Sequence, residues 1–156
     1  MYFVFVVLLM FVLPVASIAA DVLWLRDDSG LMFLFGKWFV FWTVGVRLLL
    51  AGIRQVAQPR FTAESIFDIK DPAANAMVRE IGFGNLSMGA VGLATLWQPN
   101  WLVPAAIVGG LYYGFAGMGH VFRSDRSFNE QTALVSDLLI FVVLAVFVAA
   151  SVWWAQ

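Results

Sequence analysis

The end of the chain reads QTALVSDLLIFVVLAVFVAASVWW, from Gln131 to Trp154. A single charged residue, Asp137, interrupts this run of mostly aliphatic and aromatic side chains. A helix that crosses a bilayer needs about 20 predominantly apolar residues, so the stretch predicts a transmembrane helix. Just before it, Ser127-Phe128-Asn129-Glu130 has the pattern of a capping box, in which Glu130 bonds back to the Ser127 amide.

Four similar stretches precede this one. The predicted fold is therefore an all-α, polytopic transmembrane helical bundle, a single domain over 1–156 with five spans at 2–25, 31–56, 76–97, 101–122 and 131–154. Composition agrees, because 62% of the residues are hydrophobic and only 12% are charged, against about a quarter charged in soluble domains. The first stretch is interpreted as a retained span, since no Lys or Arg precedes it as in a signal peptide.

The basic residues indicate the orientation of the bundle. With five spans, one side carries Arg60, Lys70, Arg79, Arg123 and Arg126, and the other carries Arg26 and Lys37. Positive charge marks the cytoplasmic side, which predicts a cytoplasmic N-terminus and an external C-terminus. The outer interface then receives an aromatic belt of Trp24, Trp97, Trp101, Trp153 and Trp154.

Small residues gather on one face of each of two predicted helices. The face in span 76–97 consists of Gly82, Gly89 and Gly92, with Asn85 among them, and the face in span 101–122 consists of Gly110, Gly114 and Gly117. Glycine lets helix backbones approach closely in lipid. Two interpretations remain open, which are packing within the bundle and contact with a second copy or another protein.

Ionisable residues inside the spans form the candidate site. Arg47 lies well within the second span, where a charge is unfavourable unless it is paired or hydrated. We expect it to point into the bundle and to meet Glu80 or Asp137. The full predicted polar cluster is Arg47, Arg54, Glu80, Asn85, His120 and Asp137. It is either a fixed network that specifies helix order or a site for protons or a polar ligand.

Several kinds of chemistry are not indicated by the sequence. It has no cysteine, and His120 is the only histidine, so we predict no metal site. We find no phosphate-binding loop, nucleophile elbow or paired-histidine motif, and we predict no catalytic residues. A net charge of −1 argues against nucleic acid as a partner. The segment Thr62–Ile69 is interpreted as a short helix at the cytoplasmic interface or a loop on the bundle.

Two motifs carry a resemblance to a known family. They are Arg79-Glu80-Ile81-Gly82-Phe83-Gly84-Asn85-Leu86, and Gly117-Met118-Gly119-His120 with Asn129-Glu130 beyond it. Over Ala51–Phe141 the chain resembles an uncharacterised family of small bacterial integral membrane proteins, and it is loosely similar to DoxX-like proteins. The resemblance implies a bacterial inner-membrane location, and it supplies no activity because none is established for that family. Gln55 stands where a histidine is expected, which weakens any pairing of two histidines.

The sequence favours a non-enzymatic protein that acts as an accessory or structural subunit of a membrane assembly. Its expected partners are the lipid bilayer and other membrane subunits or further copies of the chain, and no cofactor is predicted. The alternative is a small carrier, channel, or quinone- or lipid-binding protein that uses the polar cluster.

Overall fold

The computed structural model describes residues 2–122 and 126–154, and every regular element in these ranges is helical. The first rod is continuous and consists of α1 (Tyr2–Val7), η1 (Leu8–Val12), α2 (Leu13–Ala20) and η2 (Asp21–Leu25). It ends where Arg26 adopts a left-handed conformation, with φ of 51°. In the turn that follows, the hydroxyl and amide of Ser29 donate to Asp27, which lowers the pKa of that carboxyl.

The second rod consists of α3 (Leu31–Phe39), η3 (Val40–Arg47) and α4 (Leu48–Ala57). Its middle part, η3, is π-helical, a local widening that frequently marks functional sites. In η3 the Thr43 carbonyl accepts a hydrogen bond of 2.6 Å from the Tyr113 hydroxyl. The π-helical segment therefore connects directly to a helix from the second half of the chain.

The remaining helices are α5 (Pro59–Ser65), α6 (Ala74–Ala94), η4 (Pro99–Trp101), α7 (Leu102–Val121) and α8 (Phe128–Trp154). A side-chain contact stabilises the turn before α6, and a side chain caps α8. The Asp71 carboxylate accepts from the Ala73 amide at 2.9 Å, and the Ser127 hydroxyl accepts from the Glu130 amide at 3.1 Å. The second contact is the Ser127 half of the predicted capping box.

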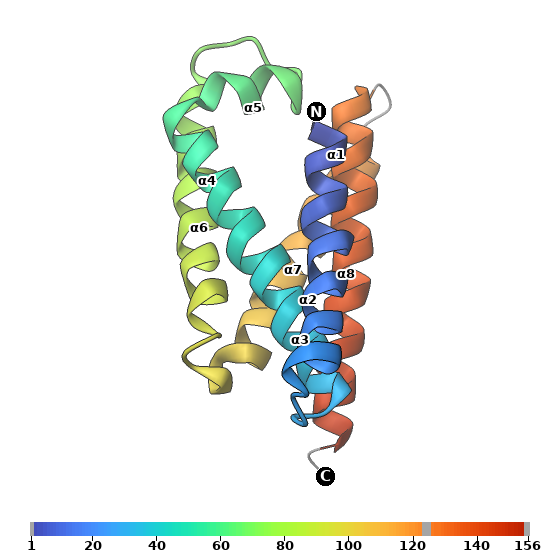
Figure 1. The fold of residues 1–156 in the computed structure, drawn as a ribbon. Helices are drawn as coiled ribbons and strands as arrows, with labels where there is room; N and C mark the ends of the chain where they lie inside the picture. The colour runs from blue at the N-terminus through green and yellow to red at the C-terminus, as the bar shows by residue number, and fades with distance from the viewer. Residues whose placement is uncertain (1, 123–125, 155–156) are drawn as a thin grey trace.

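The long helices lie side by side in one bundle (Figure 1). The pairs α4–α6 and α7–α8 make extensive contacts, and the first rod runs beside α8. The apolar core between them includes Met10, Val40, Val44, Ile140 and Leu144. The N-terminus, α5 and the beginning of α8 are at one end of the bundle, and the C-terminus is at the other (Figure 1).

Glycine makes the α4–α6 contact close. A Cβ added to Gly89 would lie 2.6 Å from the Leu49 amide nitrogen, and one added to Gly92 would overlap the Gly45 backbone. Gly82 faces Gln55 at 2.9 Å in the same way. The three glycines predicted on span 76–97 therefore serve packing within the bundle.

The glycines of α7 lie against α8. A Cβ on Gly110 would be 3.4 Å from the Cβ of Leu144, which is ordinary contact. The corresponding distances are 2.9 Å from Gly114 to the Phe141 ring and 2.7 Å from Gly117 to Leu138. This face also belongs to the interior of the bundle.

Four helices of the described chain are long and apolar enough to cross a membrane, namely Tyr2–Leu25, Leu31–Ala57, Pro99–Val121 and Phe128–Trp153. The fifth predicted span corresponds to α6, which is not among the four. Its composition is the reason, because Arg79, Glu80, Asn85 and Ser87 dilute its apolar residues.

Candidate functional site

A buried ion pair joins the second rod to α8. Arg47 is the last residue of η3, and its Nη2 donates to Asp137 Oδ1 at 2.8 Å and to Ser136 Oγ at 3.1 Å. Arg47 is 8% exposed and Asp137 is 7% exposed. Of the two carboxylates predicted to meet Arg47, the structure brings Asp137 to it. The pair satisfies the charges where water is scarce.

Aromatic rings surround the guanidinium of this pair. It lies over the Tyr113 ring, 4.8 Å from the centroid, in a cation–π arrangement. Tyr2, from the beginning of the first rod, also interacts with it electrostatically. The second terminal nitrogen, Arg47 Nη1, is buried and has no hydrogen-bond partner among the described residues.

A second polar group lies between α4 and α6. The Asn85 Nδ2 donates to Gln55 Oε1 at 2.7 Å, and both residues are buried. Gln55 is therefore a site residue, although the sequence indicated it only as a departure from a family pattern. The Tyr112 hydroxyl interacts with the Asn85 side chain. The carbonyl oxygen Oδ1 of Asn85 is buried without a partner in the described part of the chain.

His120 belongs to a third group, at the end of the bundle near α5. Its Nδ1 lies 3.0 Å from Glu130 Oε1, and its ring stacks on Phe67 with centroids 6.3 Å apart. Arg126 donates to the His120 carbonyl at 2.9 Å, which satisfies an oxygen at the end of α7. The group ties α7, α8 and the segment after α5 together, and it is separate from Arg47.

Two predicted members do not join the cluster. Glu80 is exposed on the outer side of α6, and Arg54 is exposed with its guanidinium 3.5 Å from the centroid of the Phe61 ring. The expectation of one cluster is thus wrong, since Glu80 lies five residues before Asn85 and five helical residues turn through about 140°. Only one of the two can face α4.

A further ion pair was not predicted. Lys37 Nζ lies 2.8 Å from Asp21 Oδ2, and Trp38 Nε1 donates to the same oxygen at 2.7 Å. Asp21 is only 2% exposed. The sequence did contain a signal, because Asp21 is the sole charged residue of the first span and Lys37 follows across a short turn.

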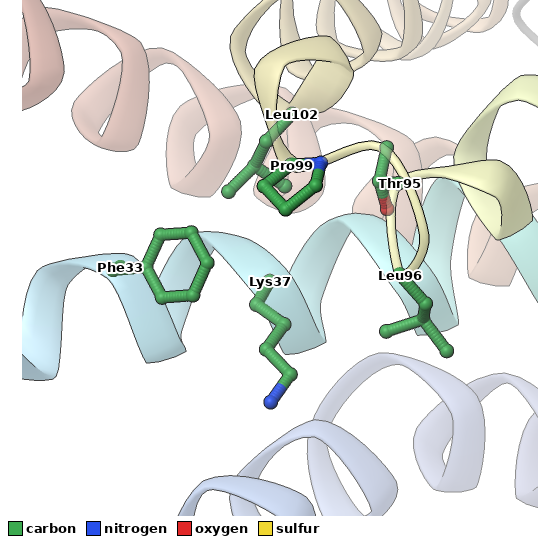
Figure 2. Close-up of a pocket in the computed structure, with 6 residues that line it drawn as sticks. All are labelled: Phe33, Lys37, Thr95, Leu96, Pro99 and Leu102. Carbon is green, nitrogen blue, oxygen red and sulfur yellow. The ribbon is translucent and has the colours of Figure 1, made fainter. Parts of the chain in front are cut away.

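A pocket of about 220 Å³ lies beside Lys37, at the opposite end of the bundle from α5 (Figure 2). It is lined by Phe33, Lys37, Thr95, Leu96, Pro99 and Leu102. The Lys37 amine extends away from the pocket's apolar walls (Figure 2) and is already paired with Asp21. The pocket therefore presents no free charge to a ligand.

No group of three or more His, Asp or Glu residues that could hold a metal ion occurs in 2–122 and 126–154. The site provides hydrogen-bonding groups inside an apolar bundle, namely the Arg47 guanidinium and the Asn85 side-chain amide. Such groups can orient a small molecule or fix the helices against one another.

An all-helical bundle with four helices able to cross a membrane, and with ion pairs enclosed between them, defines a multi-pass helical membrane protein. Within that class, the chain belongs to the family of unknown function DUF6790, whose model matches residues 2–156. The prediction of an uncharacterised family is confirmed, and the match extends beyond Ala51–Phe141. No curated protein and no solved structure matches the chain significantly.

Proposed function

We propose that the chain is a five-span protein of the bacterial inner membrane that acts as a non-enzymatic accessory subunit of a membrane assembly. The observation that carries the proposal is the outer face of α6. This helix has 21 residues, or about 31 Å at ~1.5 Å per residue, which matches a hydrocarbon core of about 30 Å.

The two faces of α6 differ in what covers them. The inner face, with Gly82, Gly89 and Gly92, is buried against the second rod. The opposite face exposes Glu80, Gly84 and Ser87. A Cβ on Gly84 would have no atom within 4 Å among the described residues. These three residues form a small, polar patch between the exposed side chains of Met77 and Val91, and nothing in the described chain covers it.

Lipid acyl chains interact weakly with such a patch. A carboxylate and a hydroxyl gain little from acyl chains, and glycine offers few contacts to them. The Ser87 hydroxyl already donates to the Phe83 carbonyl at 2.9 Å. Another transmembrane helix would pack closely against Gly84 and give the Glu80 carboxylate a hydrogen-bonding partner. A subunit partner on this face thus also accounts for α6 as a fifth span despite its modest hydropathy.

Two features support the proposed orientation, with the N-terminus in the cytoplasm. The segments between α4 and α6 and just before α8 contribute basic side chains at one end, including Arg60, Lys70 and Arg126. The other end carries exposed tryptophans, namely Trp24, Trp97, Trp101 and Trp153.

Photocrosslinking from single cysteines tests the subunit role, since the chain has no native cysteine. Ser87→Cys labelled with benzophenone maleimide in native membranes should give a protein adduct. Val142→Cys, near the middle of α8 on its exposed side, should give lipid adducts only. Native mass spectrometry of the wild type should show one defined assembly that contains the crosslinked subunit.

Gly84→Leu supplies the matched loss-of-contact variant. It should dissolve that assembly without lowering the thermal stability of the chain itself, because Gly84 has open space beside it and leucine favours helix over glycine. A wild-type mass equal to one chain, together with only lipid adducts at Ser87→Cys, would overturn the proposed role.

A further inference from the structure

Within the described part of the chain, Arg47 Nη1 and Asn85 Oδ1 are buried without hydrogen-bond partners. Arg47 Nη1 is a donor on a residue that is 8% exposed, and Asn85 Oδ1 is an acceptor on a residue that is 2% exposed. Leaving a buried polar group without a hydrogen bond costs about 1–3 kcal/mol, and more when the group is charged. Native structures retain few such atoms, and each calls for an explanation.

The two atoms belong to one region of the bundle. The Tyr112 hydroxyl interacts with the Asn85 side chain and also experiences the charges of Asp137 and Arg47. Along the second rod, Gln55, the partner of Asn85, lies eight residues beyond Arg47, or about 12 Å at ~1.5 Å per residue. Tyr112 therefore lies near both the Arg47 and the Asn85 side chains.

Charge restricts what could occupy the region. The Arg47 guanidinium and the Asp137 carboxylate, 2.8 Å apart, sum to zero. An anion drawn to Arg47 would meet the Asp137 carboxylate, and a cation drawn to Asp137 would meet the guanidinium. A neutral head that accepts from Arg47 and donates to Asn85 avoids both conflicts.

We infer that Arg47 Nη1 and Asn85 Oδ1 form a binding site for a neutral, apolar-tailed molecule with a hydroxyl-bearing head. One oxygen of the head accepts from Arg47 Nη1, and a hydroxyl donates to Asn85 Oδ1. A quinol and a diacylglycerol share this chemistry. The inference goes beyond the accessory role and does not depend on it, because α6 presents Asn85 on its inner face and the proposed partner surface on its outer face.

The test measures binding to the full-length protein in phospholipid nanodiscs. The probes are decylubiquinol, decylubiquinone, dioctanoylglycerol and trioctanoylglycerol. The site should bind decylubiquinol or dioctanoylglycerol saturably, and the one that binds identifies the source of the head. The matching probe without a donor, decylubiquinone or trioctanoylglycerol, should bind at least several-fold more weakly because it cannot donate to Asn85 Oδ1.

Paired substitutions locate the binding. Arg47→Met with Asp137→Leu, and Asn85→Leu with Gln55→Leu, each remove both members of a direct contact, so that neither member is left as an unpaired buried group. Each should weaken binding about tenfold or more, the change expected from losing about 1.4 kcal/mol. Lys37→Met with Asp21→Leu, at the other end of the bundle, is the control and should leave the affinity unchanged.

The inference is overturned by any of three results. These are no saturable binding of either hydroxyl probe, equal affinity for the probes with and without a donor, or equal loss in the control variant. The comparison of probes uses the wild type alone, so it tests whether the site binds a hydroxyl-bearing head even if a double variant fails to fold.

Discussion

Arg47 shows how one residue constrains the bundle around it. An isolated arginine at the centre of a membrane costs on the order of 3 kcal/mol on insertion scales. Here its Nη2 bonds Asp137 and Ser136, and its plane covers the Tyr113 ring. These partners come from α7 and α8, so the arginine couples the second rod to the C-terminal pair of helices.

The losses of stability caused by single substitutions at the pair should not add up in the double variant. Arg47→Met or Asp137→Leu alone leaves a buried unpaired charge and should lower the free energy of unfolding by about 3–5 kcal/mol. The double variant should recover most of that loss. The exposed Arg60–Glu64 pair is the control, and Arg60→Ala should change the free energy of unfolding little, because solvent screens an exposed pair. Unfolding in detergent mixtures measures all four, and a double variant as unstable as either single one contradicts the argument.

At the scale of elements, glycine determines how closely two helices approach. On α6, the atoms nearest to Gly89 are Leu49 backbone atoms, which cannot rotate away. On α7, the neighbour of Gly114 is the Phe141 ring, which lies at the partly exposed side of α8 and can move. The same residue type therefore has different tolerance in the two contacts.

Alanine substitutions should rank these contacts. Gly89→Ala should destabilise most, by about 1–3 kcal/mol, as expected for overpacking against a rigid neighbour. Gly114→Ala should cost less, and Gly84→Ala should be neutral or stabilising by up to about 1 kcal/mol because alanine favours helix. Thermal unfolding of the purified chain gives the order. If Gly89→Ala is as stable as Gly84→Ala, the close α4–α6 approach is incorrect.

At the scale of the molecule, an odd number of spans places the two ends of the chain on opposite sides. The N-terminus and the C-terminus lie at opposite ends of the bundle (Figure 1). Whether α6 crosses the membrane therefore decides which side receives the C-terminus, and the basic residues indicate which end is cytoplasmic.

Reporter fusions test this topology. Alkaline phosphatase fused after Gln156 should be active, because it would fold in the periplasm. A green fluorescent protein that matures only in the cytoplasm should stay dark at the same position and should fluoresce when inserted after Asp68. The opposite pattern at Gln156 would show that the span count or the orientation is wrong.

Much of the helical framework could be predicted because hydropathy and helical spacing are local properties. Helical spacing alone could have predicted that Glu80 and Asn85 lie on different faces of their helix. It could also have been predicted that Asp21 and Lys37 pair across the turn between the first two spans. The capping pattern at Ser127 was informative about the helix start, but it did not predict that the Glu130 carboxylate meets His120. That contact requires knowing how α7 returns beside α8.

Local sequence established that the chain is helical and that charges within its apolar helices need partners. It predicted five spans, and four helices of the described chain are long and apolar enough to cross a membrane. It left open whether Arg47 meets Glu80 or Asp137. The choice follows from the rotation of α6, which buries Gly82, Gly89 and Gly92 against the second rod and turns Glu80 outward. A helix's rotation depends on every surface packed around it at once, so it is a property of the assembled bundle and of no single stretch of sequence.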